Sequence, residues 1–481
     1  MRRTKIVATL GPATDTPESI EKLIAAGANV VRLNFSHGSP EEHAQRAKMV
    51  RDAADKLGCI VGILGDLQGP KIRIDRFKDG KVMLKPGADF YLDSDMGVED
   101  GNEECVGLTY KTLPQEVAAG DELLLDDGRI ILMVKSVAGT RIHCEVVNGG
   151  ILSNNKGINR RNGGLSADAL TEKDIEDIKT AAAIGVDFLA VSFPRSADDM
   201  HYARRLMKEV GGRAALVSKL ERAEVIHQPV LDDIIKASDI VMVARGDLGV
   251  EIGDANLPLT QKNIINRCRT LNRIVITATQ MMETMIDNPI PTRAEVFDVA
   301  NAVIDGTDAV MLSGETAVGK HPHRVVEVMS EICEEAERSP RATESKHRMD
   351  IEFERVDECI AMSTMYAANH MDVKAIGALT ESGSTARWMS RISSGISIFA
   401  LTNHERTCRL VSIYRGVYPV LLKQKLSDPL VANRVVVDHL IDEGVVHDGD
   451  HMIVTKGDLM GRDGGTNQMK IIRVGNHDNA G

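Results

Sequence analysis

Aromatic residues are scarce in this sequence, and the patterns that would indicate a membrane protein or a secreted protein are missing. Phe, Trp and Tyr together make up 3% of the 481 residues, so aliphatic side chains must fill most of the core. No run of about 18 apolar residues, the length that spans a membrane, occurs. The amino terminus passes directly into a strand-like segment without the apolar stretch of a secretory signal. We therefore expect a cytoplasmic protein.

Cysteine pairs and basic clusters are missing as well. The seven cysteines are widely scattered and include no Cys-x-x-Cys pair, which argues against a zinc site or a dithiol redox site and predicts buried free thiols in a reducing compartment. The net charge is -12, and no Lys/Arg run is interleaved with aromatic residues. A nucleic acid or an acidic membrane surface is therefore not an expected partner. At about 150 residues per domain, the length predicts roughly three domains.

Short runs rich in Val, Ile and Leu alternate with segments of helical periodicity through most of the first 340 residues. Such alternation predicts β/α units with parallel strands, and eight units close into a (β/α)8 barrel of the TIM type. The eight runs are Lys5 to Leu10, Asn29 to Phe35, Ile60 to Leu67, Asp187 to Phe193, Ala215 to Glu221, Asp239 to Asp247, Ile274 to Thr279 and Asp308 to Glu315.

Two other regions have sequence patterns that differ from that of the predicted barrel. Residues 69–168 contain short alternating segments separated by Gly or Asp, which predicts a small β domain inserted at the barrel rim. Residues 339–350 resemble a linker, and residues 346–475 again alternate helix and strand, which predicts an α/β domain with an open, mostly parallel sheet. The barrel itself is expected to comprise residues 1–68 and 169–340.

Polar residues stand where six of the barrel strands should end. Because the carboxyl ends of barrel strands form the active site, these residues are expected to converge on one pocket. They are Arg32, Asn34, Ser36 and His37 after the second strand, Asp66 after the third, Lys219 and Glu221 on the fifth, Arg245 and Asp247 on the sixth, Thr277, Thr279 and Gln280 on the seventh, and Ser313 and Glu315 on the eighth.

Lys219 and Glu221 are the most informative of these residues. Their spacing of two places both side chains on one face of the strand, while Leu220 points to the helix layer. Asp247 on the next strand adds a second carboxylate, and two carboxylates with room for water and substrate oxygens suit Mg²⁺. The alternative for Lys219 and Glu221 is a structural ion pair, which would be the preferred reading of a single pair in isolation.

Other strand-end residues allow two readings. Gly246 permits close approach of a ligand to the backbone. The alternation of side chains along the seventh strand is expected to point Thr279 into the barrel. Thr277 is read more simply as a β-branched strand residue. Arg32 is a planar donor suited to phosphate but can equally bind a structural carboxylate, and His37 can be a plain loop residue.

Ordered motifs along almost the whole chain resemble the pyruvate kinase family. They are Arg32-Leu-Asn-Phe-Ser-His-Gly38, Gly65-Asp-Leu-Gln-Gly-Pro-Lys-Ile-Arg73, Ser218-Lys-Leu-Glu221, Met242-Val-Ala-Arg-Gly-Asp-Leu-Gly-Val-Glu251, Ala278-Thr-Gln-Met-Met-Glu283, the run from Thr292 to Val303, and Met311-Leu-Ser-Gly-Glu-Thr316. The resemblance implies a glycolytic phosphotransferase that converts phosphoenolpyruvate and ADP into pyruvate and ATP through an enolate, with an inserted β-barrel acting as a lid.

The resemblance also implies roles for individual residues. Arg32 and Lys219 would hold the transferring phosphoryl group, and Glu221 and Asp247 would hold Mg²⁺, for which Mn²⁺ can substitute. Gly246 and Thr279 would contact the substrate. The nucleotide phosphates would face Asn34, His37, Arg73 and Lys156, and a pocket for a monovalent cation would comprise Asn34, Ser36, Asp66 and Leu67.

Two positions depart from the commonest pattern of the family. Lys71 stands where potassium-dependent relatives carry a glutamate. Its ammonium group can replace the charge of K⁺, so we expect activity without potassium. Val318 stands where many relatives have a lysine, which leaves a nucleotide role for that loop open.

The C-terminal domain contains a candidate effector site. Thr380-Glu-Ser-Gly-Ser-Thr385 follows a predicted strand and opens a helix, where hydroxyl and N–H groups suit a phosphate. Without the family likeness a simple helix cap is the preferred reading. With it we expect a sugar phosphate at Thr380, Ser382, Ser384 and Thr385, covered by the loop of residues 456–465.

The assembly state follows from the family likeness, and two alternative functions compete with it. The resemblance implies a homotetramer. The competing enzyme is a Mg²⁺-dependent aldolase or lyase on a similar barrel. The competing non-enzyme is a catalytically idle sensor of sugar phosphates.

Overall fold

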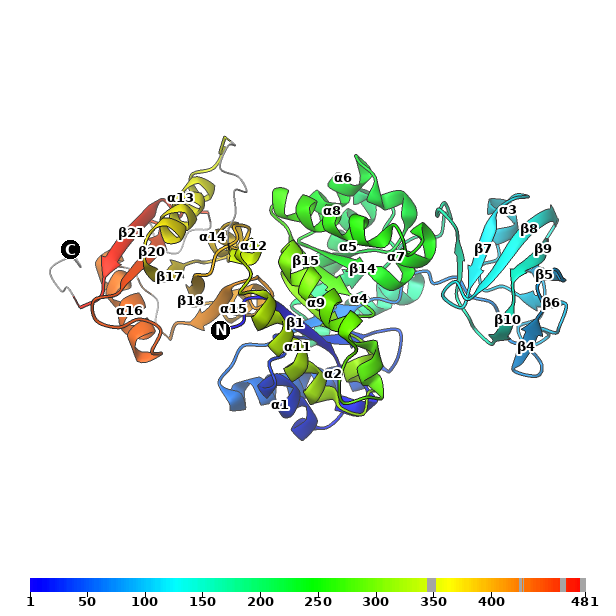
Figure 1. Cartoon of the computed structure of the whole chain (residues 1–481), viewed down its shortest axis with the longest axis horizontal. Coiled ribbons are helices and arrows are strands. Elements are labelled where there is room, and N and C mark those ends of the chain that lie inside the picture. Colours follow the sequence, from blue (N-terminus) through cyan, green and yellow to red (C-terminus); the bar gives the residue numbers. More distant parts are fainter. Residues whose placement is uncertain (344–351, 424–425, 427, 459–463, 476–481) are drawn as a thin grey trace.

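The computed structural model describes residues 1–343, 352–423, 426, 428–458 and 464–475, and they form three regions in a row (Figure 1). A helix-covered barrel lies in the middle, the inserted β domain projects from one end, and the C-terminal α/β domain packs on the other. Of the residues predicted as a linker, 344–350 lie outside the described part, as do residues 459–463 of the predicted effector loop. Within the described residues, no helix combines the length and the apolar character needed to cross a membrane.

The middle region is the predicted (β/α)8 barrel. Within residues 1–343, eight parallel strands close in the order β1-β16-β15-β14-β13-β12-β3-β2. The strands are β1 (Lys5–Thr9), β2 (Val30–Asn34), β3 (Gly62–Asp66), β12 (Phe188–Val191), β13 (Ala215–Leu220), β14 (Ile240–Ala244), β15 (Ile274–Ala278) and β16 (Ala309–Leu312). All eight coincide with the runs predicted from the sequence, and each is shorter than its run.

Helices cover the outside of this barrel. The longer ones are α1 (Pro17–Ala25), α2 (Pro40–Leu57), α4 (Glu172–Ile184), α5 (Ala197–Glu209), α6 (Val230–Ala237), α8 (Leu257–Thr270), α9 (Arg293–Asp305) and α11 (Pro322–Ala336). The shorter ones are α7 (Arg245–Ile252), α10 (Gly314–Ala317), α12 (Pro340–Thr343) and the 3₁₀ turns η1 (Pro12–Thr14), η2 (Ala223–Ile226) and η3 (Glu283–Ile286). Several begin at a hydroxyl cap; the Thr171 side chain, for example, accepts the N–H of Asp174 at the start of α4.

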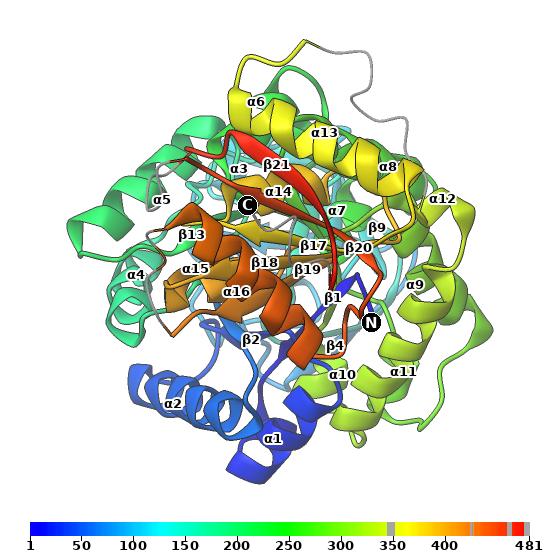
Figure 2. The same cartoon turned by 90° about the vertical axis from the view of Figure 1, so that its left-hand side faces the viewer.

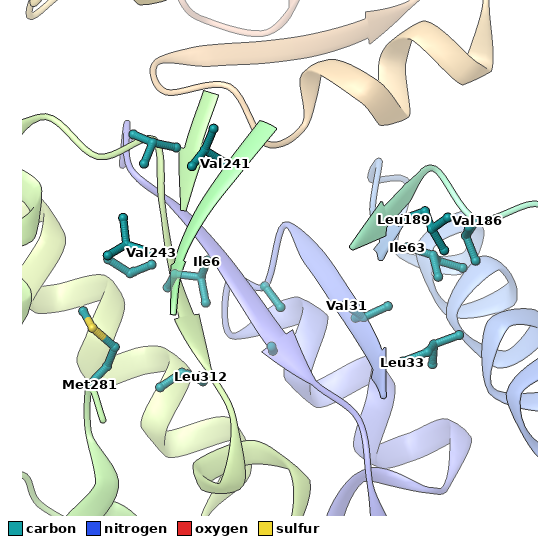
Figure 3. Packing of buried hydrophobic residues seen from close by; sticks show 14 of the residues in the cluster. Ile6, Val31, Leu33, Ile63, Val186, Leu189, Val241, Val243, Met281 and Leu312 are labelled. Atoms are coloured by element: carbon teal, nitrogen blue, oxygen red, sulfur yellow. The ribbon is translucent and has the colours of Figure 1, made fainter. Parts of the chain in front are cut away.

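Alternation along each strand separates two hydrophobic clusters. Ile6 and Leu220 face the helices, whereas Val7 and Val217 belong to the cluster in the barrel interior. Figure 3 shows the outer cluster, in which Val31, Ile63 and Leu189 come from neighbouring strands. The parity predicted for Lys219 is confirmed, because Leu220 packs in the helix layer.

The inserted region is built from β-strands. A six-stranded sheet in the order β11-β7-β8-β9-β5-β6 lies beside a two-stranded sheet of β10 and β4, and all of these residues are described. The elements are β4 (Lys81–Leu84), β5 (Asp89–Asp93), β6 (Cys105–Gly107), α3 (Leu113–Glu116), β7 (Glu122–Leu125), β8 (Ile130–Ala138), β9 (Arg141–Asn148), β10 (Gly150–Ser153) and β11 (Ile158–Arg160). Its core is a separate hydrophobic cluster that includes Phe90, Leu123 and Leu132.

The C-terminal region contains the predicted open, mostly parallel sheet. Among its described residues the strand order is β19-β18-β17-β20-β21, and only β21 runs antiparallel to its neighbour. The elements are α13 (Val356–His370), β17 (Val373–Leu379), α14 (Ser384–Ser390), β18 (Ser397–Thr402), α15 (Glu405–Val411), β19 (Val417–Leu421), α16 (Pro429–Asp442), β20 (His451–Lys456) and β21 (Gln468–Arg473).

The C-terminal domain packs on the amino ends of the barrel strands. Figure 2 views the molecule from this side, with the sheet in front of the ring of barrel helices. The interior cluster of the barrel continues into the domain through Phe188, Met389 and Ile413. A buried ion pair crosses the seam, where Arg391 Nη1 donates to Asp308 Oδ2 at 2.8 Å. The opposite end of the barrel, where the predicted site lies, therefore stays open to ligands.

Candidate active site

One cavity of about 230 Å³ at the carboxyl ends of the barrel strands collects most of the predicted site residues. Its volume suits a small substrate rather than a whole nucleotide. The sequence-predicted residues that line it are Arg32, Asn34, Ser36, His37, Asp66, Leu67, Lys71, Arg73, Lys219, Glu221, Asp247, Thr279 and Ser313. Polar residues from strands far apart in the sequence thus meet in one place.

Lys219 is held at the centre of a charged network. Its Nζ lies 3.0 Å from Glu221 Oε1 and 3.4 Å from Asp66 Oδ1, and it donates to Ser192 Oγ at 2.7 Å. Burial opposes the ammonium form, but the carboxylates of Asp66 and Glu221 outweigh it and raise the pKa of Lys219. Lys219 therefore remains a fixed positive charge at neutral pH.

Asp66 joins the second cation to this network. Arg32 Nε donates to Asp66 Oδ2 at 2.6 Å, and Arg32 Nη1 reaches Thr9 Oγ1 at 3.2 Å. Burial alone would raise the pKa of Asp66, yet Lys219 and Arg32 together lower it, so the carboxylate is ionised. One buried carboxylate thus positions both cations at the same wall of the cavity.

Glu221 is the buried carboxylate of the predicted metal pair. It follows β13 directly, is 2% exposed, and its Oε2 accepts the N–H of Phe193 at 2.8 Å. Phe193 adopts a left-handed backbone with φ of 54°. Burial, reinforced by the charge of Asp247, raises the pKa of Glu221 despite the nearby Lys219. A bound cation would reverse this effect, since it stabilises the ionised form.

Asp247 departs from its predicted position. The run from Asp239 to Asp247 was expected to be one strand, but β14 ends at Ala244 and Asp247 lies in the first turn of α7. Arg245, the first residue of α7, donates to the Ala278 and Thr279 carbonyls at the end of β15. Asp247 Oδ1 is 3.2 Å from Lys71 Nζ, which comes from the segment after β3. Lys71 is therefore paired with the predicted metal ligand.

The donor set fits Mg²⁺. Glu221 and Asp247 supply hard carboxylate oxygens on one cavity, and Asp247 is still 22% exposed, which leaves space for water and substrate oxygens. Among the described residues, no three His, Cys, Asp or Glu side chains are grouped to hold a metal by themselves. An ion held here would need oxygen ligands from water or a bound molecule to complete its shell.

Thr279 occupies a strained position held by Arg245. Its φ is 67°, in the left-handed region that a β-branched residue rarely adopts. Thr279 Oγ1 accepts the N–H of Gly246 at 2.8 Å, and buried Arg245 donates through Nη2 to the Thr279 carbonyl at 2.5 Å. Arg245 is fixed in turn by Asp298 at 2.7 Å. Strain maintained in this way is typical of functional sites.

Several predicted residues lie elsewhere. Lys156 does not line the cavity and instead pairs with Asp126 at 2.6 Å. Thr277 is buried and bonded to Thr307, in line with the simpler reading of it as a strand residue. Glu315 accepts the N–H groups of Ser313 and Met282 and fixes the loop after β16, so it plays a structural part.

Two residues that support the site were not predicted, and the structural role of a third, Arg245, was not foreseen. Ser192 bridges Lys219 to the Leu67 carbonyl, Phe193 presents its N–H to Glu221, and Arg245 pins Thr279. Ser192 and Phe193 end the fourth strand run, and a polar serine at that end was the available signal. Arg245 was expected among the polar residues at the strand ends, but its structural role was not, because its partner Asp298 comes from a distant helix.

The effector segment forms the turn between β17 and α14. Thr380 Oγ1 accepts the N–H of Gly383 at 2.9 Å, and buried Thr385 is bonded to Thr466 at 2.7 Å. Ser382 and Ser384 are partly exposed. The turn lies at the carboxyl end of β17.

All seven cysteines are free, and burial raises the pKa of several of their thiols, among them Cys333 to about 12. The prediction of free thiols is confirmed, whereas their predicted burial holds for five of them: Cys59 is half-buried and Cys359 is exposed.

Comparison with known proteins identifies the family. Residues 1–326 match the family model of the pyruvate kinase barrel domain, and residues 358–472 match that of the pyruvate kinase alpha/beta domain. The chain is 59% identical to pyruvate kinase II of Salmonella typhimurium over 476 residues, which cover 98% of this chain and 99% of that protein. It is 58% identical to the pyruvate kinase of Haemophilus influenzae, with 95% and 96% covered, and 44% identical to that of Staphylococcus aureus, with 99% and 81% covered. With the barrel, the inserted domain and the charged cavity in place, the chain belongs to the pyruvate kinase family and is a phosphotransferase.

Proposed function

We propose that the chain transfers the phosphoryl group of phosphoenolpyruvate to ADP with Mg²⁺ held by Glu221 and Asp247. The observation that carries this proposal is the single cavity in which Arg32, Lys219 and the two carboxylates meet. Phosphoryl transfer needs positive charge in fixed positions more than covalent help from the protein. The network around Asp66 fits this requirement.

Arg32 and Lys219 would neutralise the phosphoryl group as it moves between oxygen atoms. Asp66 fixes both cations, so little reorganisation is needed when charge shifts during transfer. Lys219 is also paired with Glu221. It would therefore lie between the proposed metal ligand and the side of the cavity where the phosphoryl group would bind. When bound, Mg²⁺ would supply a Lewis acid for the substrate carboxylate and enolate oxygens. Gly246 and Thr279 would shape the substrate position from the opposite side.

The nucleotide would approach from the side of the inserted domain. Asn34, His37 and Arg73 line the cavity rim, and Arg73 Nη1 is bonded to the Asn155 carbonyl of the inserted domain at 2.9 Å. Lys156 would reach the nucleotide phosphates by exchanging its partner Asp126 for them when the inserted domain closes and excludes water.

An assay of ATP formation from phosphoenolpyruvate and ADP tests this function. We expect ATP and pyruvate to form in equal amounts and only with a divalent cation, Mn²⁺ replacing Mg²⁺. Cleavage of a carbon–carbon bond without ATP formation would favour the aldolase or lyase alternative. Sugar-phosphate binding without turnover would favour the sensor.

Lys71 motivates the proposal that activity does not require potassium. Lys71 lines the same cavity as Asn34, Ser36 and Asp66, the oxygen-bearing residues of the proposed cation pocket, and its ammonium group is paired with Asp247. A lysine fixed there places a permanent positive charge where K⁺ would otherwise be needed.

We predict initial rates that are equal, within about twofold, in K⁺-free and K⁺-rich buffer. Lys71→Glu should make the rate rise about tenfold or more when K⁺ is added, because the local charge is then reversed. Lys179→Glu on α4, an exposed lysine paired with Glu176, is the matched control and should show no K⁺ response. Strong K⁺ stimulation of the unmodified enzyme would refute the proposal.

A sugar phosphate at the β17–α14 turn is the proposed activator. Ser382 and Ser384 are partly exposed and, within the described residues, their hydroxyl groups accept and donate no hydrogen bond. They are thus available to phosphate oxygens. The buried hydroxyl of Thr385 would have to leave Thr466 to take part.

We predict that sugar monophosphates raise the unfolding temperature and lower the KM for phosphoenolpyruvate. Ser382→Ala with Ser384→Ala should weaken this response about tenfold or more, since hydrogen bonds to a charged group are lost. Ser363→Ala on α13 serves as the control within the same domain. An undiminished response in the double variant would remove the site from consideration.

The homotetramer remains a proposal from family likeness, and light scattering tests it. The cytoplasmic location also remains a proposal.

A further inference from the structure

Two segments of chain join the inserted domain to the barrel, and both are bound beside the proposed metal site. The entry segment (residues 67–73) carries Lys71, whose Nζ lies 3.2 Å from Asp247 Oδ1. The return segment (residues 161–168) leads from β11 towards α4 and is bound by Arg222, which belongs to the barrel. The two connections of the inserted domain are therefore both fixed by side chains at the mouth of the barrel.

Arg222 binds the return segment through two backbone carbonyl groups. Its Nη1 donates to the Leu165 carbonyl at 2.6 Å, and its Nη2 donates to the Ala167 carbonyl at 3.1 Å. Arg222 is 5% exposed, so these charge-assisted hydrogen bonds are sheltered from water. The side chains of Leu165 and Ala167 belong to the hydrophobic core of the inserted domain. One barrel side chain thus holds residues that are packed inside the inserted domain.

Arg222 is also connected to Glu221, in two ways. It is the next residue in the chain, so the two share a peptide bond. In addition, its guanidinium carbon lies 5.9 Å from the centre of the Phe193 ring, an arrangement that is attractive for a cation. The N–H of Phe193 is the group that Glu221 Oε2 accepts at 2.8 Å. A displaced Arg222 would therefore disturb both the backbone of Glu221 and the hydrogen bond that orients its carboxylate.

Arg195 binds the same return segment without adjoining either carboxylate in the sequence. Its Nη1 donates to the Ser166 carbonyl at 2.5 Å, and its Nη2 donates to Asp168 Oδ1 at 3.0 Å. Its side chain is 32% exposed, in contrast to that of Arg222. Attachment of the return segment and support of Glu221 can thus be separated, because Arg195 serves the first whereas Arg222 is placed to serve both.

We propose that Arg222 is a positioning residue that sets the orientation of Glu221 and couples it to the inserted domain. This inference rests on the proposed function, since it takes Glu221 as a ligand of the divalent ion. Arg222 does not line the catalytic cavity and acts only through Glu221 and Phe193. Coupling of this kind is reciprocal: the attached return segment strengthens binding of the ion, and the bound ion orders the return segment.

The affinity for Mn²⁺ tests the first direction of this coupling. Arg222→Met should weaken Mn²⁺ binding to the full-length protein about tenfold in titration calorimetry without substrate or nucleotide, because a residue that orients a ligand is lost. Arg222→Lys keeps a positive charge that can bind one carbonyl and should give an intermediate affinity. Arg195→Met is the matched control and should leave the affinity unchanged. Thermal unfolding shows which variants are folded, and Arg222→Lys decides the question if Arg222→Met is not.

Hydrogen exchange of residues 161–168, measured by mass spectrometry, tests the second direction. Saturating Mn²⁺ should slow exchange in the unmodified protein. In Arg222→Met the same saturation should leave exchange unchanged, because the connection from Glu221 to the return segment is broken. Arg195→Met should exchange faster without the ion and still be slowed by it. A residue that only stabilises the fold would alter exchange equally with and without Mn²⁺.

Three results would overturn the inference. The first is an unaltered Mn²⁺ affinity in both Arg222 variants while Glu221→Gln weakens binding, in which case the proposed metal site stands and only the role of Arg222 falls. The second is full protection of residues 161–168 by Mn²⁺ in Arg222→Met. The third is a loss of affinity in Arg195→Met as large as that in Arg222→Met. Normal Mn²⁺ binding by Glu221→Gln itself would overturn the proposed metal site together with this inference.

Discussion

Replacing Lys219 by methionine should lower kcat for ATP formation by about a thousandfold or more, because the variant loses a preorganised charge that acts on the transferring phosphoryl group. Methionine is nearly the same length but carries no charge. Glu221 and Asp247 are unchanged, so Mn²⁺ binding, measured by titration calorimetry, should stay within about threefold of the unmodified protein. The substitution would thus lower turnover without changing the affinity for the metal.

Two controls make this result interpretable. Lys179→Met alters an exposed lysine of α4 and should leave turnover unchanged. Thermal unfolding of Lys219→Met shows whether the variant is folded, since Asp66 and Glu221 lose a common partner and only Arg32 still neutralises Asp66. Near-normal turnover in a folded Lys219→Met protein would contradict the assigned role.

Neutralising the two carboxylates proposed to hold the metal should have the second large effect. Glu221→Gln and Asp247→Asn each keep the side-chain shape but remove an anionic ligand, so the Mg²⁺ concentration for half-maximal rate should rise about a hundredfold or more. Glu251→Gln is the matched control, because Glu251 is also a buried carboxylate near the barrel mouth but does not line the catalytic cavity. Its burial raises its pKa to about 7.

The two variants should differ in one respect. Asp247→Asn also breaks the ion pair with Lys71, whereas Glu221→Gln leaves that pair in place. If Lys71 competes with the metal for Asp247, Lys71→Met should lower the Mg²⁺ requirement. An unaltered Mg²⁺ dependence in both carboxamide variants would show that the ion binds elsewhere.

The barrel was predictable because its pattern is local. Each strand is a short apolar run between amphipathic segments, and closure by eight units follows from their number. The positions of Lys219 and Glu221 followed from parity within one strand. In the inserted domain the signal was weaker: strands such as β5 (Asp89–Asp93) and β11 (Ile158–Arg160) are short and half-exposed, so their alternation was not distinctive.

The missed features depend on contacts between distant segments. Arg245 follows β14 and binds Asp298 and the Thr279 carbonyl, and no pattern within residues 239–247 reveals those partners. The pairing of Lys71 with Asp247 joins segments 176 residues apart. Ser192 and Phe193 act through a hydroxyl and a backbone N–H, groups that sequence patterns seldom distinguish from ordinary loop residues.

The position of the divalent ion is tested most directly by anomalous diffraction from crystals grown with Mn²⁺ and oxalate. We expect one strong peak about 2.0 to 2.2 Å from carboxylate oxygens of both Glu221 and Asp247, with Lys219 Nζ on the side of the oxalate. A peak at any other place, or Glu221 and Asp247 directed away from a common ion, would contradict the proposed catalytic site.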